Sequence, residues 1–409
     1  MSTLPQQGRT WPQLEAAMAE LAKGDVDWRA GKTAVYVFNA GEDVEQVQKA
    51  AYAAFMAENG LGPAAFPSLK QMEAEVIGYG LSLLHAPQGA AGAITSGGTD
   101  SITMALKAAR DFHRQEKGRT GRLNVVLPVS AHLAFDKAAA LMEIEIRRTP
   151  LKDFLADPAA IDAAADADTC MAVGSAPCFP YGLMDPIEAL GALAQARGLW
   201  LHVDACVGGY AAPFVRMNGA AIAPFDFEVP GVSSMSADLH KYGFCAKGAS
   251  SVLFRSEDLK KRMTFDFRDW PGGRMVTPTL AGTRPGGAIA AAWAVMNHLG
   301  VDGYRAKHRQ VTEAREIIEA GVKARGYQVI GGPQLGLIAY AGMPSAAALW
   351  QKLRERGWFT STTSDPPGLH LMLSPVHREI AETYLLDLDW AARELGDTTA
   401  PAQAPRYAG

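Results

Sequence analysis

Short apolar runs alternate with segments of helical spacing through the middle of the chain, from about residue 92 to residue 254. In the helical segments, such as 100–115 and 135–142, apolar residues recur three and four positions apart. The later apolar runs lack polar alternation, which is typical of parallel strands covered on both faces. The pattern predicts a mostly parallel sheet covered by helices, with strands at 93–99, 123–128, 144–149, 169–174, 199–204 and 250–254.

The pattern changes towards both ends of the chain. Near the N-terminus it predicts helices with an interruption, and then a helix at 68–84 whose start, Ser68 with Gln71, resembles a capping box. After Gly287 it predicts two long helices at 288–299 and 304–325, followed by short strands and two more helices. We therefore expect an N-terminal helical segment at 1–58, a large domain at 59–287, a smaller α/β domain at 288–395 and a disordered tail at 396–409.

The composition is that of a globular protein, with 48% hydrophobic and 20% charged residues. The formal net charge of -4 gives no general attraction to nucleic acid or to an anionic membrane surface. The four cysteines form no Cys-X-X-Cys pair, so we expect no structural metal site and a reducing, cytoplasmic location. No run of 18 uncharged apolar residues is present, and we expect no membrane-spanning segment.

A glycine turn follows the predicted strand at 93–99, in the sequence Thr95-Ser-Gly-Gly-Thr-Asp-Ser101. Gly97 and Gly98 let a ligand approach the backbone, and the helix that begins here offers unpaired N–H groups and a positive dipole end. Such a turn suits a phosphate monoester, although an ordinary capped turn has the same local pattern.

Two more polar residues stand at the ends of predicted strands. Asp204 ends an apolar strand, and an acid at this edge of a parallel sheet faces the ligand crevice, although it also fits a simple turn cap. His132 follows the strand at 123–128, where it is either a packing residue or a stacking partner for an aromatic ligand.

A lysine lies between two apolar segments in Ser236-Ala-Asp-Leu-His-Lys-Tyr-Gly243. A lysine in a partly dry pocket has a lowered pKa and can act as an amine nucleophile, so we expect this of Lys241. A phosphate turn, an acid, a histidine and a lysine on one sheet edge are together what pyridoxal 5'-phosphate requires. The lysine forms a Schiff base, and the acid keeps the pyridine nitrogen protonated.

The sequence resembles the fold-type-I pyridoxal-phosphate enzymes, in the group of the amino-acid decarboxylases, and more closely the sphingosine-1-phosphate lyases. The resemblance covers roughly residues 30 to 300 and implies a homodimer with shared active sites. The matching stretches are Thr95–Ser101, Ser130–Lys137, Gly174–Gly182, His202–Gly209, Ser236–Gly243 and Leu280–Arg284.

The resemblance implies a role for each matching position. Lys241 would be the Schiff-base lysine and Asp204 the partner of the pyridinium, with His132 and Cys206 near the two faces of the ring. Cofactor phosphate would be bound by Gly98, Thr99 and His240, and from a second subunit by Gly282 and Thr283. The substrate pocket would be lined by Tyr36, Asn59, Lys247 and Tyr181, with Tyr36 also serving catalysis.

This chain differs from the lyase pattern at two positions, because Gly62 and Tyr181 stand where the family usually has histidine. The resemblance implies retro-aldol cleavage of a phosphorylated or anionic 2-amino-3-hydroxy compound, which gives an aldehyde and a small amine such as phosphoethanolamine. The alternative is α-decarboxylation of an L-amino acid, and a catalytically silent scaffold is a further one. Apolar residues such as Phe179, Phe244 and Leu61 fit either a lipid tunnel or the core.

Overall fold

The computed structural model describes Met1 and residues 3–396, and the predicted tail lies outside this part except for Gly396. Its largest sheet has seven strands in the order β1-β9-β8-β7-β6-β2-β3. β9 runs antiparallel to β1 and β8, and the other pairs are parallel, which confirms the predicted fold class. The strands are β1 (Ala91–Thr95), β2 (Asn124–Pro128), β3 (Glu145–Thr149), β6 (Thr169–Ser175), β7 (Leu201–Asp204), β8 (Val232–Ala237) and β9 (Ser250–Phe254).

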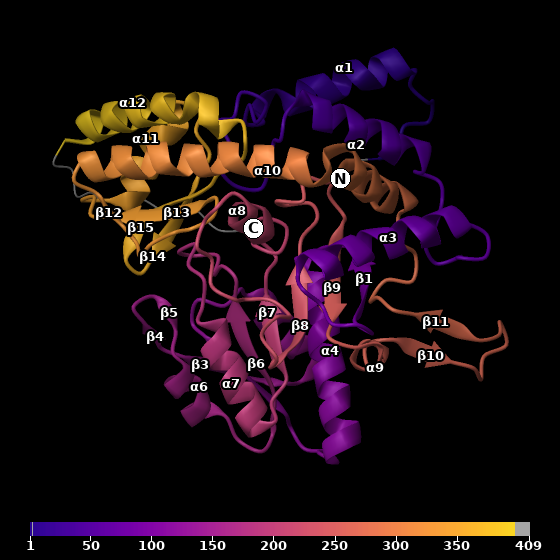
Figure 1. Cartoon of the computed structure of the whole chain (residues 1–409). Helices are drawn as coiled ribbons and strands as arrows, with labels where there is room; N and C mark the ends of the chain where they lie inside the picture. The colour runs from indigo at the N-terminus through magenta and orange to yellow at the C-terminus, as the bar shows by residue number, and fades with distance from the viewer. Residues whose placement is uncertain (2, 397–409) are drawn as a thin grey trace.

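Helices cover both faces of this sheet (Figure 1). Alternate residues of β2 face opposite ways, so that Val125 and Leu127 belong to one buried cluster and Val126 to another. The first cluster includes α4 (Gly98–Lys117) and α5 (Ala134–Met142), and the second includes α3 (Pro67–Leu83) and α7 (Ile187–Arg197). The shorter elements in this part of the chain are β4 (Leu151–Lys152), β5 (Leu155–Ala156), α6 (Pro158–Ala164), α8 (Ala212–Met217) and α9 (Glu257–Lys261).

A second, antiparallel sheet follows in the C-terminal part, with the order β12-β13-β15-β14. The long helix α10 (Gly286–Ala324) runs from α3 to this sheet (Figure 1), and Gly300, with φ of 54°, interrupts it between the two helices that were predicted. The remaining elements here are β12 (Gln328–Val329), β13 (Leu337–Ala341), α11 (Ala346–Glu355), β14 (Ser361–Ser364), β15 (Pro367–Met372) and α12 (His377–Leu395).

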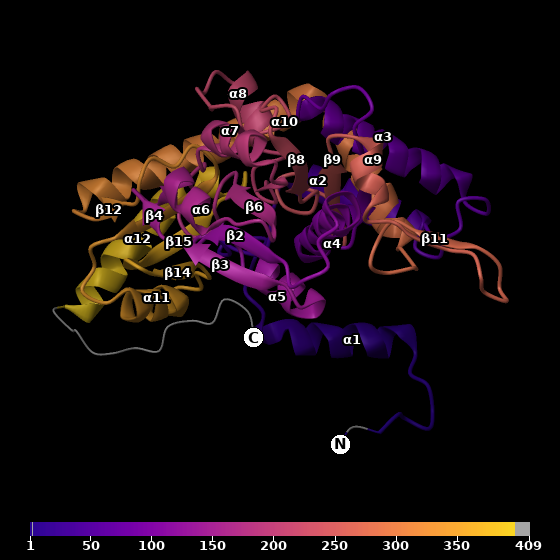
Figure 2. The ribbon, with the colours of Figure 1, turned by 90° about the horizontal axis from the view of Figure 1, so that it is seen from below.

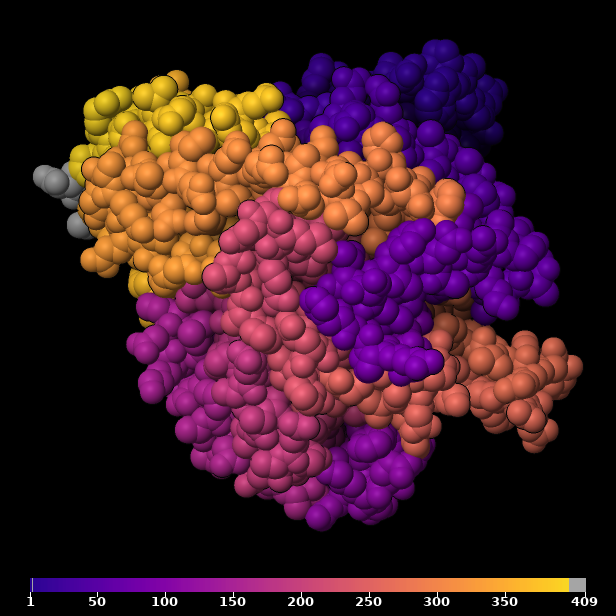
Figure 3. Space-filling view, in the orientation of Figure 1, coloured from indigo at the N-terminus to yellow at the C-terminus, as the bar shows by residue number. Residues whose placement is uncertain are grey.

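Two elements stand out from the body of the chain. Helix α1 (Trp11–Leu21) has no buried residue and lies apart from the sheets (Figure 2). The ribbon of β10 (Phe265–Phe267) and β11 (Met275–Thr277) projects at the right of Figure 3. Helix α1 is followed in the sequence by a 3-10 turn at Ala22–Gly24 and by helix α2 (Glu42–Ala54). Among the described residues, no helix has the length and apolar character needed to cross a membrane.

Among the details that the sequence prediction got wrong, two concern the large sheet and a helix that covers it. The helix predicted from Ser68 is α3, but its N-cap is Phe66 and no side chain caps it, because Pro67 takes the first helical position, where a missing N–H costs nothing. Strand β8 was not predicted, since its serines, Ser233, Ser234 and Ser236, do not read as a buried strand.

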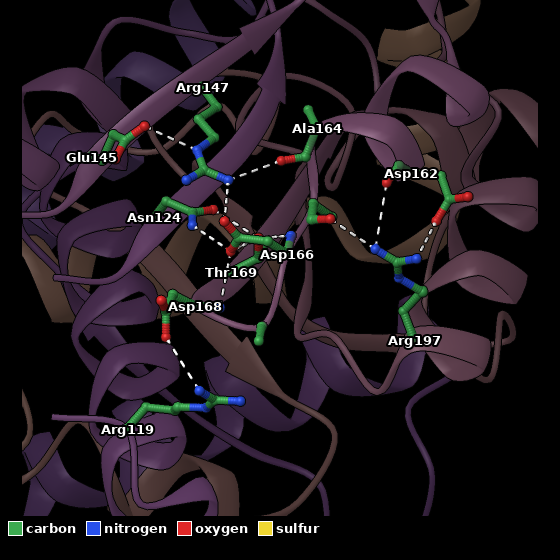
Figure 4. A network of polar contacts seen from close by, with 12 residues as sticks. Arg119, Asn124, Glu145, Arg147, Asp162, Ala164, Asp166, Asp168, Thr169 and Arg197 are labelled. Atoms are coloured by element: carbon green, nitrogen blue, oxygen red, sulfur yellow. Dashed lines mark hydrogen bonds and ion pairs between the residues drawn. The ribbon is translucent and has the colours of Figure 1, made fainter. Parts of the chain in front are cut away.

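A polar network ties β2, β3 and β6 together at their N-terminal ends (Figure 4). Arg147 Nη1 donates to Asp166 Oδ2 at 2.6 Å, and Asn124 Nδ2 donates to Asp166 Oδ1 at 2.9 Å. Thr169 Oγ1 in turn donates to Asn124 Oδ1 at 2.7 Å. The Arg147 guanidinium is the main cause that lowers the pKa of Asp166 to about 2.

Candidate active site

The candidate residues come together at the C-terminal edge of the large sheet. Asp204 pairs in register with Ser175 on one side and Ser236 on the other, so the ends of β6, β7 and β8 are level. β1 runs in the same direction as β8, because both are antiparallel to β9 between them. The glycine turn after β1 and the lysine segment after β8 therefore reach the same edge.

A pocket of about 390 Å³ opens at this edge. A larger groove of about 880 Å³ lies beside β13 and β14, but its lining contains no ionisable side chain. The smaller pocket is the candidate site because the lysine, acid, histidine and glycine turn singled out in the sequence all line it. It is lined by Ser96, Gly97, Gly98, Thr99, Asp100, Ile102, His132, Pro177, Phe179, Asp204, Cys206, Val207, Asp238, His240 and Lys241.

Lys241 forms an ion pair in this pocket. Its Nζ lies 2.9 Å from Asp238 Oδ2, and the Lys241 side chain is 22% exposed. Burial is the largest single effect and disfavours the charged amine, but the charge and hydrogen bond of Asp238, together with smaller contributions from Cys206 and Asp204, outweigh it and raise the pKa of Lys241. The expected lowering of this pKa was therefore wrong, because a buried carboxylate stands beside the amine. Burial alone would raise the pKa of Asp238, but the charges of Lys241 and His240 together with side-chain hydrogen bonds outweigh it, so this pKa is lowered.

Asp204 is held at the end of a chain of buried hydrogen bonds. Its Oδ1 accepts from Cys206 N at 3.1 Å and from Ser236 Oγ at 3.0 Å. Ser236 Oγ lies 3.2 Å from His202 Nε2, and burial lowers the pKa of His202 to about 4, so this ring is neutral. The chain continues from His202 Nδ1 to Ser234 Oγ at 2.8 Å, which accepts from Trp200 Nε1 at 2.8 Å. The Asp204 carboxylate is thereby fixed in orientation and remains an acceptor.

The glycine turn has no room for a side chain at Gly98. A Cβ on Gly98 would lie 2.8 Å from Cys206 Sγ and 3.0 Å from both carboxylate oxygens of Asp238. Beside it, Ser96 N and Ser96 Oγ donate to Asp100 Oδ2 at 3.0 and 3.1 Å, which holds the turn at the start of α4.

Residues present here fit pyridoxal phosphate. One pocket is lined by a lysine, a buried carboxylate and the glycine-containing start of a helix. These groups match, in that order, the aldehyde, the ring nitrogen and the phosphate of the cofactor. Within the described part of the chain, Asp238 Oδ1 and His240 Nδ1 are buried without a hydrogen-bond partner. Polar atoms of this kind around a pocket indicate a polar ligand.

His132 lies on the pocket wall as the sequence predicted. Its Nδ1 accepts from Ala134 N at 3.1 Å, and burial lowers its pKa. The ring of Phe179 stands edge-on to it, with centroids 6.3 Å apart, and Phe179 in turn packs on His370 of β15 at 4.6 Å. The small sheet thus reaches the wall of the pocket through an aromatic pair.

The residues expected to bind substrate lie outside this pocket in the single chain. Lys247 Nζ donates to His240 O at 3.2 Å, and Tyr181 Oη donates to Asp365 O at 2.6 Å. Tyr36 is 44% exposed and lies beside Phe359, with ring centroids 6.0 Å apart. Of the three residues weighed for a lipid tunnel, Phe179 lines the pocket, Leu61 is partly exposed and Phe244 is fully buried in the core.

Gly282 and Thr283 also lie outside the pocket. Asn59 Nδ2 donates to Thr283 Oγ1 at 3.3 Å, and a small crevice separates Thr283 from Ser96 and Asp100 of the same chain. Gly62 lies two residues beyond Gly60, whose N–H donates to Arg284 O at 2.9 Å. The 59–62 segment and the 282–284 segment therefore form one unit next to the start of α4.

Lys241 and Lys247 differ in their electrostatic surroundings. Desolvation and repulsion by Lys241 lower the pKa of Lys247 to about 8, although the residue as a whole is exposed to solvent. Cys206 lines the pocket, and burial raises the pKa of its thiol well above the ordinary value. The charge of Lys247 therefore changes close to neutral pH.

Sequence reasoning missed Asp238 as a site residue. It stands three positions before Lys241, and the only signal was its place in the same charged segment. Among the described residues, the one group with metal-ligand spacing is His85, Asp226 and Glu228, at the opposite edge of the sheet. Arg216 pairs with Glu228 at 2.8 Å, so this group already has a cation.

Comparisons with known proteins agree with this geometry. Residues 2–341 match the pyridoxal-dependent decarboxylase conserved domain. The sphingosine-1-phosphate lyase of Oryza sativa subsp. japonica is 40% identical over 376 residues, which are 89% of this chain and 69% of that protein. That of Dictyostelium discoideum is 37% identical over 94% of this chain and 73% of its own length. The structure of a Burkholderia pseudomallei sphingosine-1-phosphate lyase superposes with a TM-score of 0.92 at 33% identity, covering 96% of this chain and 93% of that one.

Proposed function

The chain belongs to the pyridoxal-dependent decarboxylase family and, within it, to the sphingosine-1-phosphate lyases, and on that premise we propose which of its residues perform the reaction. It is a lyase that depends on pyridoxal 5'-phosphate. The observation that carries the assignment of residues is that Lys241 and Asp204 line one pocket with the Gly98 turn.

Cofactor binding is assigned to residues of the pocket and its rim. Lys241 would hold the aldehyde as a Schiff base, and Asp204 would pair with the ring nitrogen. Gly98, Thr99 and His240 would bind the phosphate, since the N-terminus of α4 favours an anion and His240 Nδ1 is available as a donor. His132 and Cys206 lie on the pocket walls, where they would contact the two faces of the ring.

Bound in this way, the cofactor supplies an electron-accepting ring that stabilises negative charge on the substrate Cα. Asp204 preserves that capacity, because its fixed carboxylate favours a protonated ring nitrogen. Once released from the aldehyde, the Lys241 amine would lie beside the reacting atoms and would serve as their acid–base group. Burial raises the pKa values of Tyr36 and Tyr181, so near neutral pH these hydroxyls are proton donors rather than bases.

The substrate is a phosphorylated or otherwise anionic 2-amino-3-hydroxy compound. A base removes the proton of the 3-hydroxyl, the Cα–Cβ bond breaks, and the oxygen remains on the departing aldehyde. Cα then gains a proton, and the second product is a small amine such as phosphoethanolamine. We assign the anionic end of the substrate to Lys247, with Tyr36, Asn59 and Tyr181 as further contacts.

A homodimer with shared sites is part of the proposal. Side chains of α1 and of the β10–β11 ribbon are apolar and exposed, and both elements extend from the body of one chain (Figures 2 and 3). Exposed apolar clusters of this kind are typical of protein interfaces. The exposed residues are Trp11, Leu14, Met18, Leu21, Phe265, Phe267 and Trp270. Sedimentation equilibrium of the full chain tests the dimer, whereas the cytoplasmic location remains a prediction.

The experiment that tests the reaction is incubation of the cofactor-loaded protein with phosphorylated 2-amino-3-hydroxy compounds and with a panel of L-amino acids. Mass spectrometry of the products should find an aldehyde and phosphoethanolamine, and both should be absent with Lys241→Ala. Release of carbon dioxide from an amino acid, without aldehyde from any phosphorylated substrate, would instead establish the decarboxylase.

A further inference from the structure

Asp238 is a buried carboxylate that the proposed reaction does not use. The residue is 2% exposed, and its Oδ2 lies 2.9 Å from Lys241 Nζ and 3.7 Å from His240 Nε2. Its Oδ1 has no hydrogen-bond partner in the described chain. A buried charge is costly unless it is paired, so the contact with Lys241 is its principal compensation.

The local fold builds this pair. Asp238 N donates to Cys206 O at 3.3 Å just after the end of β8, and Lys241 N donates to Asp238 O at 3.2 Å. The second bond closes a tight turn that places side chains three positions apart on the same side. The carboxylate therefore lies beside the Lys241 amine and next to the bare face of Gly98.

We propose that Asp238 is a positioning residue, which holds the Lys241 amine as an ammonium beside the glycine turn and sets the pH range in which that amine reacts with an aldehyde. The inference rests on the proposed role of Lys241. The reaction joins Nζ to the aldehyde carbon and expels the aldehyde oxygen as water, and it requires the ammonium first to release a proton to solvent. Asp238 opposes that release and keeps the amine in one place.

Other charged groups around Lys241 have less influence. Burial lowers the pKa values of His132 and His240, so both rings are neutral near pH 7, and burial keeps the Cys206 thiol protonated. Lys247 is a cation and disfavours a charged Lys241. Asp204, and the Cys206 thiol once it ionises at high pH, favour a charged Lys241 less than Asp238 does. The carboxylate in direct contact therefore dominates.

The test measures the reactivity of Lys241 in the full chain after removal of the cofactor. A neutral acylating reagent, N-acetoxysuccinimide, is applied over a range of pH, and mass spectrometry quantifies acetylation of the peptide that contains Lys241. The midpoint of the pH profile reports the protonation of the amine, and steric access does not shift it. We compare the wild type with Asp238→Asn and with Asp226→Asn, a buried aspartate at the opposite edge of the sheet.

In Asp238→Asn the midpoint should move down by about one pH unit or more, which makes labelling below the midpoint about tenfold faster, while Asp226→Asn follows the wild type. An unchanged midpoint in Asp238→Asn would overturn the proposal. If that variant does not fold, the wild type alone provides the test. A midpoint for acetylation of Lys241 at or below the midpoint for the exposed Lys70 would overturn the proposal. Because no substrate or cofactor is used, the result is independent of whether Lys241 proves to carry the cofactor.

Discussion

Ser236 Oγ donates a hydrogen bond of 3.0 Å to Asp204 Oδ1, between residues that pair in register across β7 and β8. Behind this bond stands a buried chain through His202 and Ser234 to Trp200. Ser234 and Ser236 of β8 thus form hydrogen bonds inside the core, next to the site. They hold one carboxylate in place at the edge of the sheet.

Asp204→Asn should weaken binding of pyridoxal phosphate by about a hundredfold or more, because removal of one partner of a buried ion pair leaves the other uncompensated. Ser236→Ala removes only one neutral donor and should cost about 1 kcal/mol, or roughly fivefold. Absorbance titration of each cofactor-free variant measures both. Equal effects of the two substitutions would contradict the role assigned to Asp204.

Gly98→Ala should reduce cofactor affinity by about tenfold or more, since overpacking at a tight site costs on the order of 1–3 kcal/mol. The added methyl group meets Cys206 and Asp238. Gly97→Ala is the matched control, because its Cβ would meet only His240 Cε1 at 3.6 Å, an ordinary contact. Thermal unfolding of both variants without cofactor separates loss of binding from loss of stability. Equal affinity in the two variants would show that the turn does not hold the phosphate.

Binding of the anionic substrate should weaken as pH rises through about 8, because the Lys247 ammonium is charged below this pKa and neutral above it. KM for a phosphorylated substrate should therefore increase on the alkaline side, whereas kcat should change less. Lys247→Arg keeps its charge and should move the rise in KM to higher pH, while Lys247→Gln should have a high KM throughout. A KM profile that is the same in all three proteins would exclude Lys247 from anion binding.

Low pH should reduce the stability that Asp166 provides at the end of the sheet opposite the site. The pKa of Asp166 is lowered in the folded protein, so its contribution to stability is complete above the unfolded pKa near 4 and is lost as pH falls towards about 2. Asp166 is half exposed, so solvent screening limits the contribution to about 0.2–1 kcal/mol. Urea unfolding at a series of acid pH values should show this decline in the wild type and a smaller one in Asp166→Asn. An equally steep decline in the variant would assign it to other carboxyl groups.

The hydrophobic pattern was enough to predict most of the parallel strands and most helices, since buried strands such as β6 are apolar over most of their length, here residues 170–174. It failed for β8, where polar side chains satisfy one another inside the core, and for the edge strand β14, which is polar. For the site, Asp204 and His132 could be placed at this edge because the first ends and the second follows a recognisable strand, whereas Lys241 was singled out by its charged segment between two apolar runs. The charge state of Lys241 was not, because it depends on a side-chain contact that spacing alone does not reveal.

One measurement addresses the central claim directly. The cofactor-loaded protein is reduced with borohydride, digested, and analysed by mass spectrometry for a peptide that carries a pyridoxyl phosphate group. The account predicts that the group is found on Lys241, and that Lys241→Ala retains none. Modification of a different lysine, or a wild type that carries no group after reduction, would contradict it.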